Sequence, residues 1–209
     1  MYEFKRISRT DEKFSRIGRP VPPLEAGSNH GIVKLKDYLG RWVIILSHPT
    51  DFSPTWASEI ARFADSYSKL KELHCELIGV AVANDHSPLM WPRAVQEQFE
   101  EKIWFPVIFD LHREFSKALG MVKGESDAAG LSHTIYIIDE HQILRSIVYY
   151  DPNIPNTMEE VFRLVKFLQK TNACGIVTPD NWRPGDEWIL TGPPQKKENG
   201  KVKPEMWYF

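Results

Sequence analysis

WVIILSHPTDFSPTWASEI, residues 42–60, is the stretch that decides the fold of this chain. Its first part, residues 42–46, is a short apolar run whose length and β-branched content predict a buried strand. Pro49 follows closely, and because proline has no backbone N–H, it ends the hydrogen-bonding ladder. The stretch therefore predicts a buried strand that stops at a polar loop.

A helix is expected directly after this loop. Ser53 is suited to cap it and Pro54 to occupy its first turn, and the helix should run from about Thr55 into Leu70. Backbone N–H groups converge at such a helix N-terminus, and the helix dipole favours negative charge there. A strand, a tight loop and a helix N-terminus in succession are typical of a reactive site.

The remaining chain continues to alternate strands and helices. The apolar patterns predict strands over 75–83, 105–110, 134–139 and 143–150, and helices over 88–99, 112–119 and 157–171. The turn at residues 140–142 joins the last two strands, which predicts a hairpin. Residues 29–31 indicate a turn, and residues 34–40 a short helical turn closed by glycine. This order predicts an α/β core with a mixed sheet. From residue 172 onwards the chain is rich in turn formers, so we expect this segment to pack across the core or onto another subunit.

The composition favours a packed, soluble protein. The chain has 209 residues, 42% hydrophobic and 26% charged, with a formal net charge of −2. This charge gives no electrostatic reason to expect binding to nucleic acid or to an anionic membrane. No apolar run approaches the ~20 residues that span a bilayer. The N-terminus lacks the apolar core of a secretory signal, so a cytoplasmic location is expected.

Cys75 and Cys174 are the two cysteines, and they form no CxxC motif or metal-ligand spacing. In a reducing cytosol they are expected to be free thiols. Cys75 opens an apolar strand and should be buried and inert, whereas Cys174 precedes the turn-rich segment, where a thiol can be exposed.

The loop at Pro49 resembles the active-site loop of the peroxiredoxins, the thiol-dependent peroxidases. Their signature is Pro, three residues, Thr or Ser, two residues, and then the peroxidatic Cys. Pro49 and Ser53 fit this signature, and Trp56 stands at the cysteine position. The resemblance, which is to the one-cysteine, Prx-six-like subfamily, continues through residues 29–31, 36–40, 46–54, 77–82, 105–108, 117–121, 177–186 and 206–209.

The resemblance implies a thioredoxin-like fold with a central mixed sheet flanked by helices and an extended C-terminal dimerisation segment. The corresponding division is a peroxiredoxin domain over residues 1–171 and a C-terminal segment over residues 172–209. It further implies a homodimer, which in some members assembles into a decameric ring. No cofactor and no metal are expected. Peroxide reduction is the activity that the family would predict.

Three positions that serve this chemistry are altered. Trp56 offers no nucleophile, whereas the family attacks peroxide with a thiolate. The resemblance implies an arginine six residues before Asp139, and His133 stands there. It implies a second arginine four residues before Glu160, where Asn156 stands. The joint change predicts that ordinary thiol peroxidase activity has been lost.

Two sets of residues are the candidate site. The candidate catalytic residues are His48, Ser53, Glu59 and His133, and the candidate substrate-binding residues are Pro49, Thr50, Phe52, Trp56 and Asn156. In the family the arginine at position 133 contacts a glutamate, so His133 could form an acid–base dyad with Glu59, its pKa raised by the carboxylate. The alternative is a packed histidine that keeps the old hydrogen bond. Trp56 could likewise fill the vacated pocket or stack against a flat ligand. No local spacing supports a metal site built on His48 and His133.

The sequence is compatible with three functions. The leading hypothesis is that the former peroxide pocket serves a different, cofactor-independent acid–base reaction, or binds a small organic molecule such as an aromatic one. The second is a non-catalytic oligomeric scaffold. The third is residual peroxidase activity through Cys75 or Cys174. Whether the chain is an enzyme is therefore left open by its sequence.

Overall fold

The computed structural model describes residues 16–48, 54–81, 103–122, 133–151, 154, 157–174, 176–178, 181–186 and 189–190. At residues 48, 54–57, 173–174, 176–177 and 189–190 it describes the backbone alone. The chain forms two compact units, Met1–Met158 and Glu159–Phe209.

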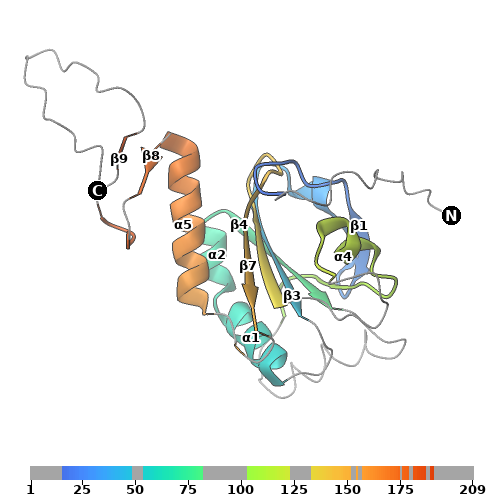
Figure 1. Ribbon diagram of the computed structural model, residues 1–209. Coiled ribbons are helices and arrows are strands. Elements are labelled where there is room, and N and C mark those ends of the chain that lie inside the picture. The colour runs from blue at the N-terminus through green and yellow to red at the C-terminus, as the bar shows by residue number, and fades with distance from the viewer. Residues whose placement is uncertain are drawn as a thin grey trace, which may run out of the picture. The chain divides into compact units, whose positions relative to one another are not determined.

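The first unit is built on a mixed sheet of seven strands in the order β2-β1-β5-β4-β3-β6-β7 (Figure 1). Its strands are β1 Glu25–Ser28, β2 Gly31–Lys34, β3 Trp42–His48, β4 Cys75–Ala81, β5 Val107–Phe109, β6 His133–Ile138 and β7 Leu144–Tyr150. β3 runs parallel to β4 and antiparallel to β6, and β4 runs parallel to β5. The predicted thioredoxin-like mixed sheet is therefore present.

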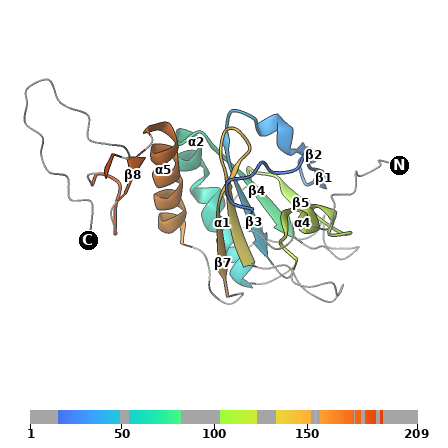
Figure 2. The same cartoon turned by 45° about the horizontal axis from the view of Figure 1, so that its top comes forward.

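Helices flank this sheet on both faces. In the first unit they are η2 Leu35–Tyr38, α1 Pro54–Asp65, α2 Tyr67–Glu72 and α4 Glu114–Leu119. Figure 2 shows α1 and α2 on one side of the sheet and α4 on the other. The second unit holds α5 Met158–Cys174, which begins one residue before it, and a short antiparallel pair, β8 Ile176–Val177 and β9 Ile189–Leu190. No helix of the described residues is long and apolar enough to span a bilayer.

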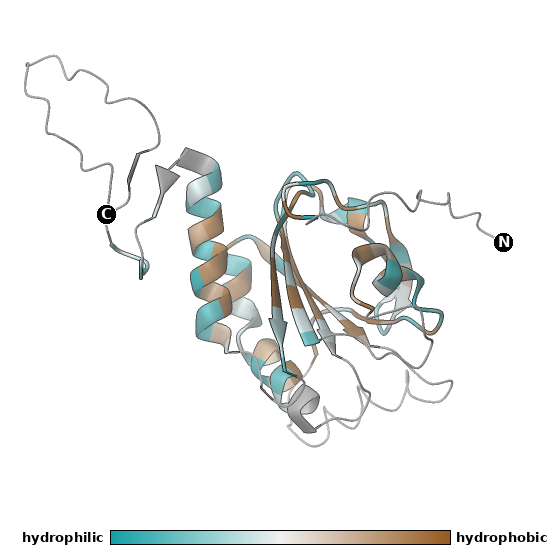
Figure 3. Cartoon of the chain, viewed as in Figure 1, coloured by the Kyte–Doolittle hydropathy of each residue, from teal (hydrophilic) through white to brown (hydrophobic). Residues whose placement is uncertain are grey.

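The core follows from the alternation of side chains along the central strands. Val43 and Ile45 belong to the buried cluster that includes Phe115 of α4. Ile44 lies between them in the sequence, is fully buried, and faces the layer of α1 and α2. Both faces of β3 are thus covered, which explains why its sequence is a continuous apolar run. Figure 3 shows the contrasting pattern of α5, along which hydrophobic and hydrophilic residues alternate.

Several local predictions are confirmed. Residues 133–150 form the predicted hairpin of β6 and β7, and the turn at residues 29–31 joins β1 to β2. α4 ends before Gly120, which has a φ of 73° and therefore supplies the left-handed conformation that a helix C-terminus often requires. The predicted helix over residues 88–99 lies outside the described residues.

The prediction of one helix from Thr55 to Leu70 is wrong at Ser66. α1 ends at Asp65, and α2 begins at Tyr67. Ser66 has φ −88° and ψ 1°, and its carbonyl accepts from the backbone N–H groups of Lys69 and Leu70. This tighter i→i+3 turn interrupts the helix, although the buried apolar stripe continues across the break.

Asp110 provides a test of the packing around α4. Its buried carboxylate accepts from the backbone N–H groups of Phe115 and Ser116, at 3.2 and 2.7 Å, and from the Ser116 hydroxyl. Asp110→Ala leaves these donors unsatisfied, so we expect the free energy of unfolding to fall by about 2–3 kcal/mol. Urea denaturation measures this change.

Glu114→Ala is the matched control, because Glu114 is exposed in the first turn of the same helix. It should change stability by less than about 0.5 kcal/mol. Equal losses in the two variants would contradict a specific role for the Asp110 carboxylate.

Candidate functional site

The site is formed where the end of β3 meets the beginning of β6. These strands are antiparallel, and Ser47 pairs with Thr134, so that His133 lies beside the last residues of β3. The hydroxyls of Ser47 and Thr134 meet at 2.5 Å on one face of the sheet. Because side chains alternate along a strand, His133 points to the other face, where α1 carries Glu59.

His133 and Glu59 form a buried hydrogen-bonded pair. The distance from His133 Nε2 to Glu59 Oε2 is 3.1 Å, and the exposed fractions of the two side chains are 0% and 1%. Nδ1 of His133 lies 3.2 Å from the backbone carbonyl oxygen of Asp151. The ring also packs against Tyr150, with a centroid distance of 5.6 Å. Both nitrogens and one face of the imidazole are therefore held in place.

The partners fix the positions of the protons. The carbonyl of Asp151 can only accept, so Nδ1 of His133 carries a proton. One further proton lies between Nε2 and the Glu59 carboxyl group, bound to one or the other. The pair is electrically neutral in both arrangements, which is how a buried acid and base avoid the cost of an isolated charge.

The surroundings of His133 favour its charged form. Burial by itself lowers the pKa of the imidazole, but the hydrogen bond and negative charge of Glu59, together with the Asp151 carbonyl, outweigh it. The net result is a pKa above the ordinary value. The His133 imidazole consequently keeps its charge to higher pH than an ordinary histidine, and its Nε2 proton faces the Glu59 carboxylate.

The contact predicted between His133 and Glu59 is present. His48 is the last residue of β3 and Trp56 lies in the first turn of α1, and only their backbones are described. The other predicted site residues, Pro49, Thr50, Phe52, Ser53 and Asn156, lie outside the described residues. In the part of the chain that the structure describes, no three His, Cys, Asp or Glu side chains gather as metal ligands do.

The sequence did not reveal Asp151 and Tyr150 as partners of His133. A count along the hairpin from its turn would place Tyr149 opposite His133. The register shifts between Ile137 and Ile138, and as a result Tyr150 pairs with His133 instead. The sequence predicts the hairpin, and with it that a residue of the second strand lies opposite His133. Apolar alternation does not show where a bulge lies, so it does not identify which residue this is.

Cys75 is buried, as predicted, with none of its surface exposed. Burial and then the negative charge of Glu76 raise the pKa of its thiol. A protonated, inaccessible thiol is a poor nucleophile. The side chain of Cys174 is not among those described.

Comparison with known proteins assigns this architecture to a family. Residues 17–147 match the AhpC/TSA family. A protein of Picrophilus torridus named peroxiredoxin 2 is 36% identical over 85% of this chain and 87% of its own length. A peroxiredoxin 2 of Sulfurisphaera tokodaii is 34% identical over 96% of this chain and 97% of its own length.

Solved structures agree with the sequence matches. A yeast mitochondrial one-Cys peroxiredoxin superposes with a TM-score of 0.77 and 29% identity, covering 87% of this chain and 88% of its own. A Cys-to-Ser mutant of peroxiredoxin 6 from Arenicola marina also gives a TM-score of 0.77, with 25% identity and coverage of 86% and 85%.

Removal of the Glu59 carboxylate tests the buried pair. In Glu59→Gln the negative charge is lost while the shape is kept, so the pKa of His133 should fall below its wild-type value. We expect the free energy of unfolding to drop by about 3 kcal/mol near pH 6, because one partner of a buried pair is removed. NMR titration of His133 and urea denaturation between pH 5.5 and 9 measure the two effects.

The pH dependence has a definite sign. The pKa of His133 is raised in the folded protein, so the pair stabilises fully below the unfolded value of about 6.5. This contribution is lost as pH rises through the folded pKa, and the difference between wild type and variant should shrink accordingly. Exposed Glu72→Gln serves as the control. A difference that grows with pH would show that the pair does not hold the imidazolium.

Proposed function

Because the chain belongs to the AhpC/TSA family of peroxiredoxins, we propose that it uses this scaffold for proton transfer rather than for thiolate chemistry. In this proposal Glu59 and His133 give a proton to, or take one from, a small organic molecule in the former peroxide pocket. The observation that carries it is the buried contact of 3.1 Å between the two side chains. No cofactor is required for such a step.

In this proposal the chain lacks the thiolate with which the family attacks peroxide. Trp56 stands where the resemblance implies the peroxidatic cysteine. Cys75 is buried in β4, and burial raises the pKa of its thiol, which argues against its use as a substitute. These two observations favour proton transfer over residual peroxidase activity.

The geometry of His133 supports transfer at one end of the ring. Nδ1 is directed to the backbone carbonyl of Asp151, so exchange through this nitrogen would break a partly buried hydrogen bond. The proton between Nε2 and Glu59 can move along this hydrogen bond without changing the net charge of the pair, which is zero in both arrangements. Transfer to a ligand would accordingly take place on the Glu59 side.

The ligand would lie against residues of the loop after β3, of the start of α1 and of the segment before α5. In the proposal these are Pro49, Thr50, Phe52, Trp56 and Asn156, while Ser53, His48 and the helix N-terminus bind an oxyanion. Trp56 would provide a flat wall, which suits an aromatic molecule.

A homodimer is part of the same proposal. β7 is the last strand in the order of the described sheet, and its residue Tyr149 has 57% of its surface exposed. Edge strands with exposed aromatic residues are suited to pair with a second copy. Sedimentation equilibrium distinguishes a monomer from a dimer or a ring, and a monomer at micromolar concentration would contradict this part of the proposal.

Peroxide consumption with dithiothreitol tests the loss of thiol chemistry. The wild type should consume peroxide no faster than a variant that combines Cys75→Ser with Cys174→Ser, because neither thiol replaces the peroxidatic one. Trp56→Cys alone should recover little activity. Trp56→Cys combined with His133→Arg and Asn156→Arg should exceed it by about 100-fold, since each cation stabilises developing negative charge. Wild-type activity that disappears in the double serine variant would contradict the proposal.

Proton transfer itself is tested by exchange into D2O. The protein is incubated with a panel of small aliphatic and aromatic carbonyl compounds, and loss of the α-proton signal is followed by NMR. One compound or more should exchange faster than in buffer, and Glu59→Gln should slow this exchange by about 100-fold. Exposed Glu72→Gln is the matched control. If no compound of the panel exchanges its α-proton faster than in buffer, and none changes the tryptophan fluorescence of the protein, the result would favour a non-catalytic scaffold.

A further inference from the structure

A second polar cluster lies at the opposite end of the parallel strands. β3 and β4 start together, with Trp42 paired to Cys75, and they end together, with His48 paired to Ala81. Glu76 is the second residue of β4 and belongs to the starting end, whereas His133 lies beside the other end. The cluster around Glu76 is therefore separate from the pair formed by Glu59 and His133.

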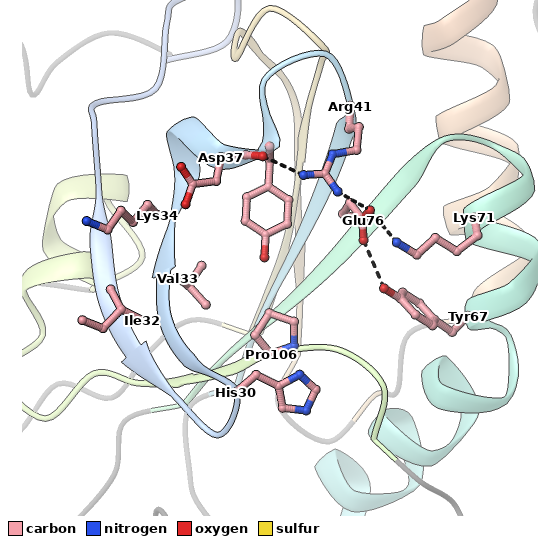
Figure 4. Close-up of a pocket in the computed structure, with 11 residues that line it drawn as sticks. His30, Ile32, Val33, Lys34, Asp37, Arg41, Tyr67, Lys71, Glu76 and Pro106 are labelled. Carbon is pink, nitrogen blue, oxygen red and sulfur yellow. Dashed lines mark hydrogen bonds and ion pairs between the residues drawn. The ribbon is translucent and has the colours of Figure 1, made fainter.

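A pocket of about 290 Å³ opens at this end (Figure 4). This volume is at the lower limit of the range for small-molecule sites. Arg41 and Lys71 belong to its lining, and the carboxylate of Glu76 lies between them. Tyr38, Tyr67 and Pro106 contribute flat apolar surface to the lining.

Glu76 holds three side chains of the pocket lining together by hydrogen bonds. Its side chain is only 9% exposed, and it accepts from Arg41 Nη1 at 2.7 Å, from Tyr67 Oη at 3.0 Å and from Lys71 Nζ. Burial alone would raise the pKa of Glu76, but these hydrogen bonds outweigh it and lower the pKa below its ordinary value. Glu76 is consequently an ionised carboxylate held by two cations.

The cluster has more positive than negative charge. Lys34, Arg41 and Lys71 are the cationic side chains of the lining and Asp37 and Glu76 the anionic ones, which leaves one net positive charge. The side chains of Arg41 and Lys71 are 43% and 47% exposed, so both can be reached from solvent. An anion that approaches from solvent meets this surplus charge, and the partly buried setting strengthens the attraction relative to bulk water.

Aromatic rings hold the two cations in place. The guanidinium of Arg41 lies 5.0 Å from the centroid of Tyr38, and Nζ of Lys71 lies 5.1 Å from the centroid of Tyr67. Arg41 also donates to the backbone carbonyl of Asp37 at 2.6 Å. Side chains that are already fixed lose little conformational entropy when a ligand binds.

We propose that this pocket binds a small organic anion, with its carboxylate or phosphate group at Arg41 and Lys71 and its planar part against Tyr67 and Pro106. Asp37 also lines the pocket, and its carboxylate opposes a second anionic group on the same ligand. The site therefore selects compounds with one anionic group on a flat apolar body.

Titration with four probes tests the site. Phenylacetate and phenyl phosphate carry both features, and they distinguish a carboxylate from a phosphate ligand. Benzyl alcohol lacks the charge and inorganic phosphate lacks the ring. We expect saturable NMR shifts at Tyr67 and Lys71 with one or both of the first two probes. Binding should be at least about 10-fold weaker for each of the last two probes.

Variants locate the binding to this pocket. Lys71→Gln and Arg41→Gln should each weaken the binding of the better probe by about 10-fold, and added salt should weaken it in the wild type. Lys69→Gln is the matched control, because Lys69 is exposed on the same helix and outside the pocket. Thermal unfolding verifies that each variant is folded, and Arg41→Gln carries the test if Lys71→Gln is not.

Three results would overturn the proposal. They are the absence of saturable shifts up to about 10 mM of either aromatic anion, equal binding of benzyl alcohol, and equal weakening by Lys69→Gln and Lys71→Gln. None of these readouts depends on proton transfer by Glu59 and His133. Failure of one proposal is thus distinguishable from failure of the other.

Discussion

The burial of Glu59 and His133 is the constraint on which the rest of the site depends. A carboxyl group and an imidazole with at most 1% of their surface exposed are stable together only if they share a proton and every polar atom finds a partner. The register of β6 against β7 meets this requirement, because it brings the Asp151 carbonyl to Nδ1 of His133. The apolar packing of β3 and α1 keeps water away from the pair.

Charged side chains are arranged differently at the two ends of the parallel strands. Glu59 and His133 form a neutral, enclosed pair beside the end of β3. At the start of β4, Glu76 meets two cations in a setting that is open to solvent and keeps a surplus of positive charge. An acid–base pair that is closed off from water is suited to proton transfer. Excess positive charge that solvent can reach is suited to the binding of an anion.

Much of the fold could be predicted because it depends on local patterns. The apolar run of residues 42–46 predicts the central strand, and two short apolar segments joined by the turn at residues 140–142 predict the hairpin. The break at Ser66 could not be predicted, because the apolar stripe of the helix continues through it. The partners of Glu76 come from two separate parts of the chain, residues 41 and 67–71, and no local pattern joins them. A single glutamate in the buried strand of residues 75–81 was nonetheless a signal that cations must lie nearby.

His133 gives the physical reason to favour acid–base chemistry at the former peroxide site. The resemblance implies an arginine at this position, and an arginine keeps its charge at every physiological pH. A histidine in the same contact with Glu59 can exchange a proton that an arginine holds permanently, although the carboxylate raises the pKa of the imidazole. In the proposed function, a histidine where the resemblance implies an arginine provides a group that can move a proton instead of a fixed positive charge. If Trp56 stands at the position of the nucleophile, as the resemblance implies, proton transfer is the chemistry that the pair of His133 and Glu59 can support.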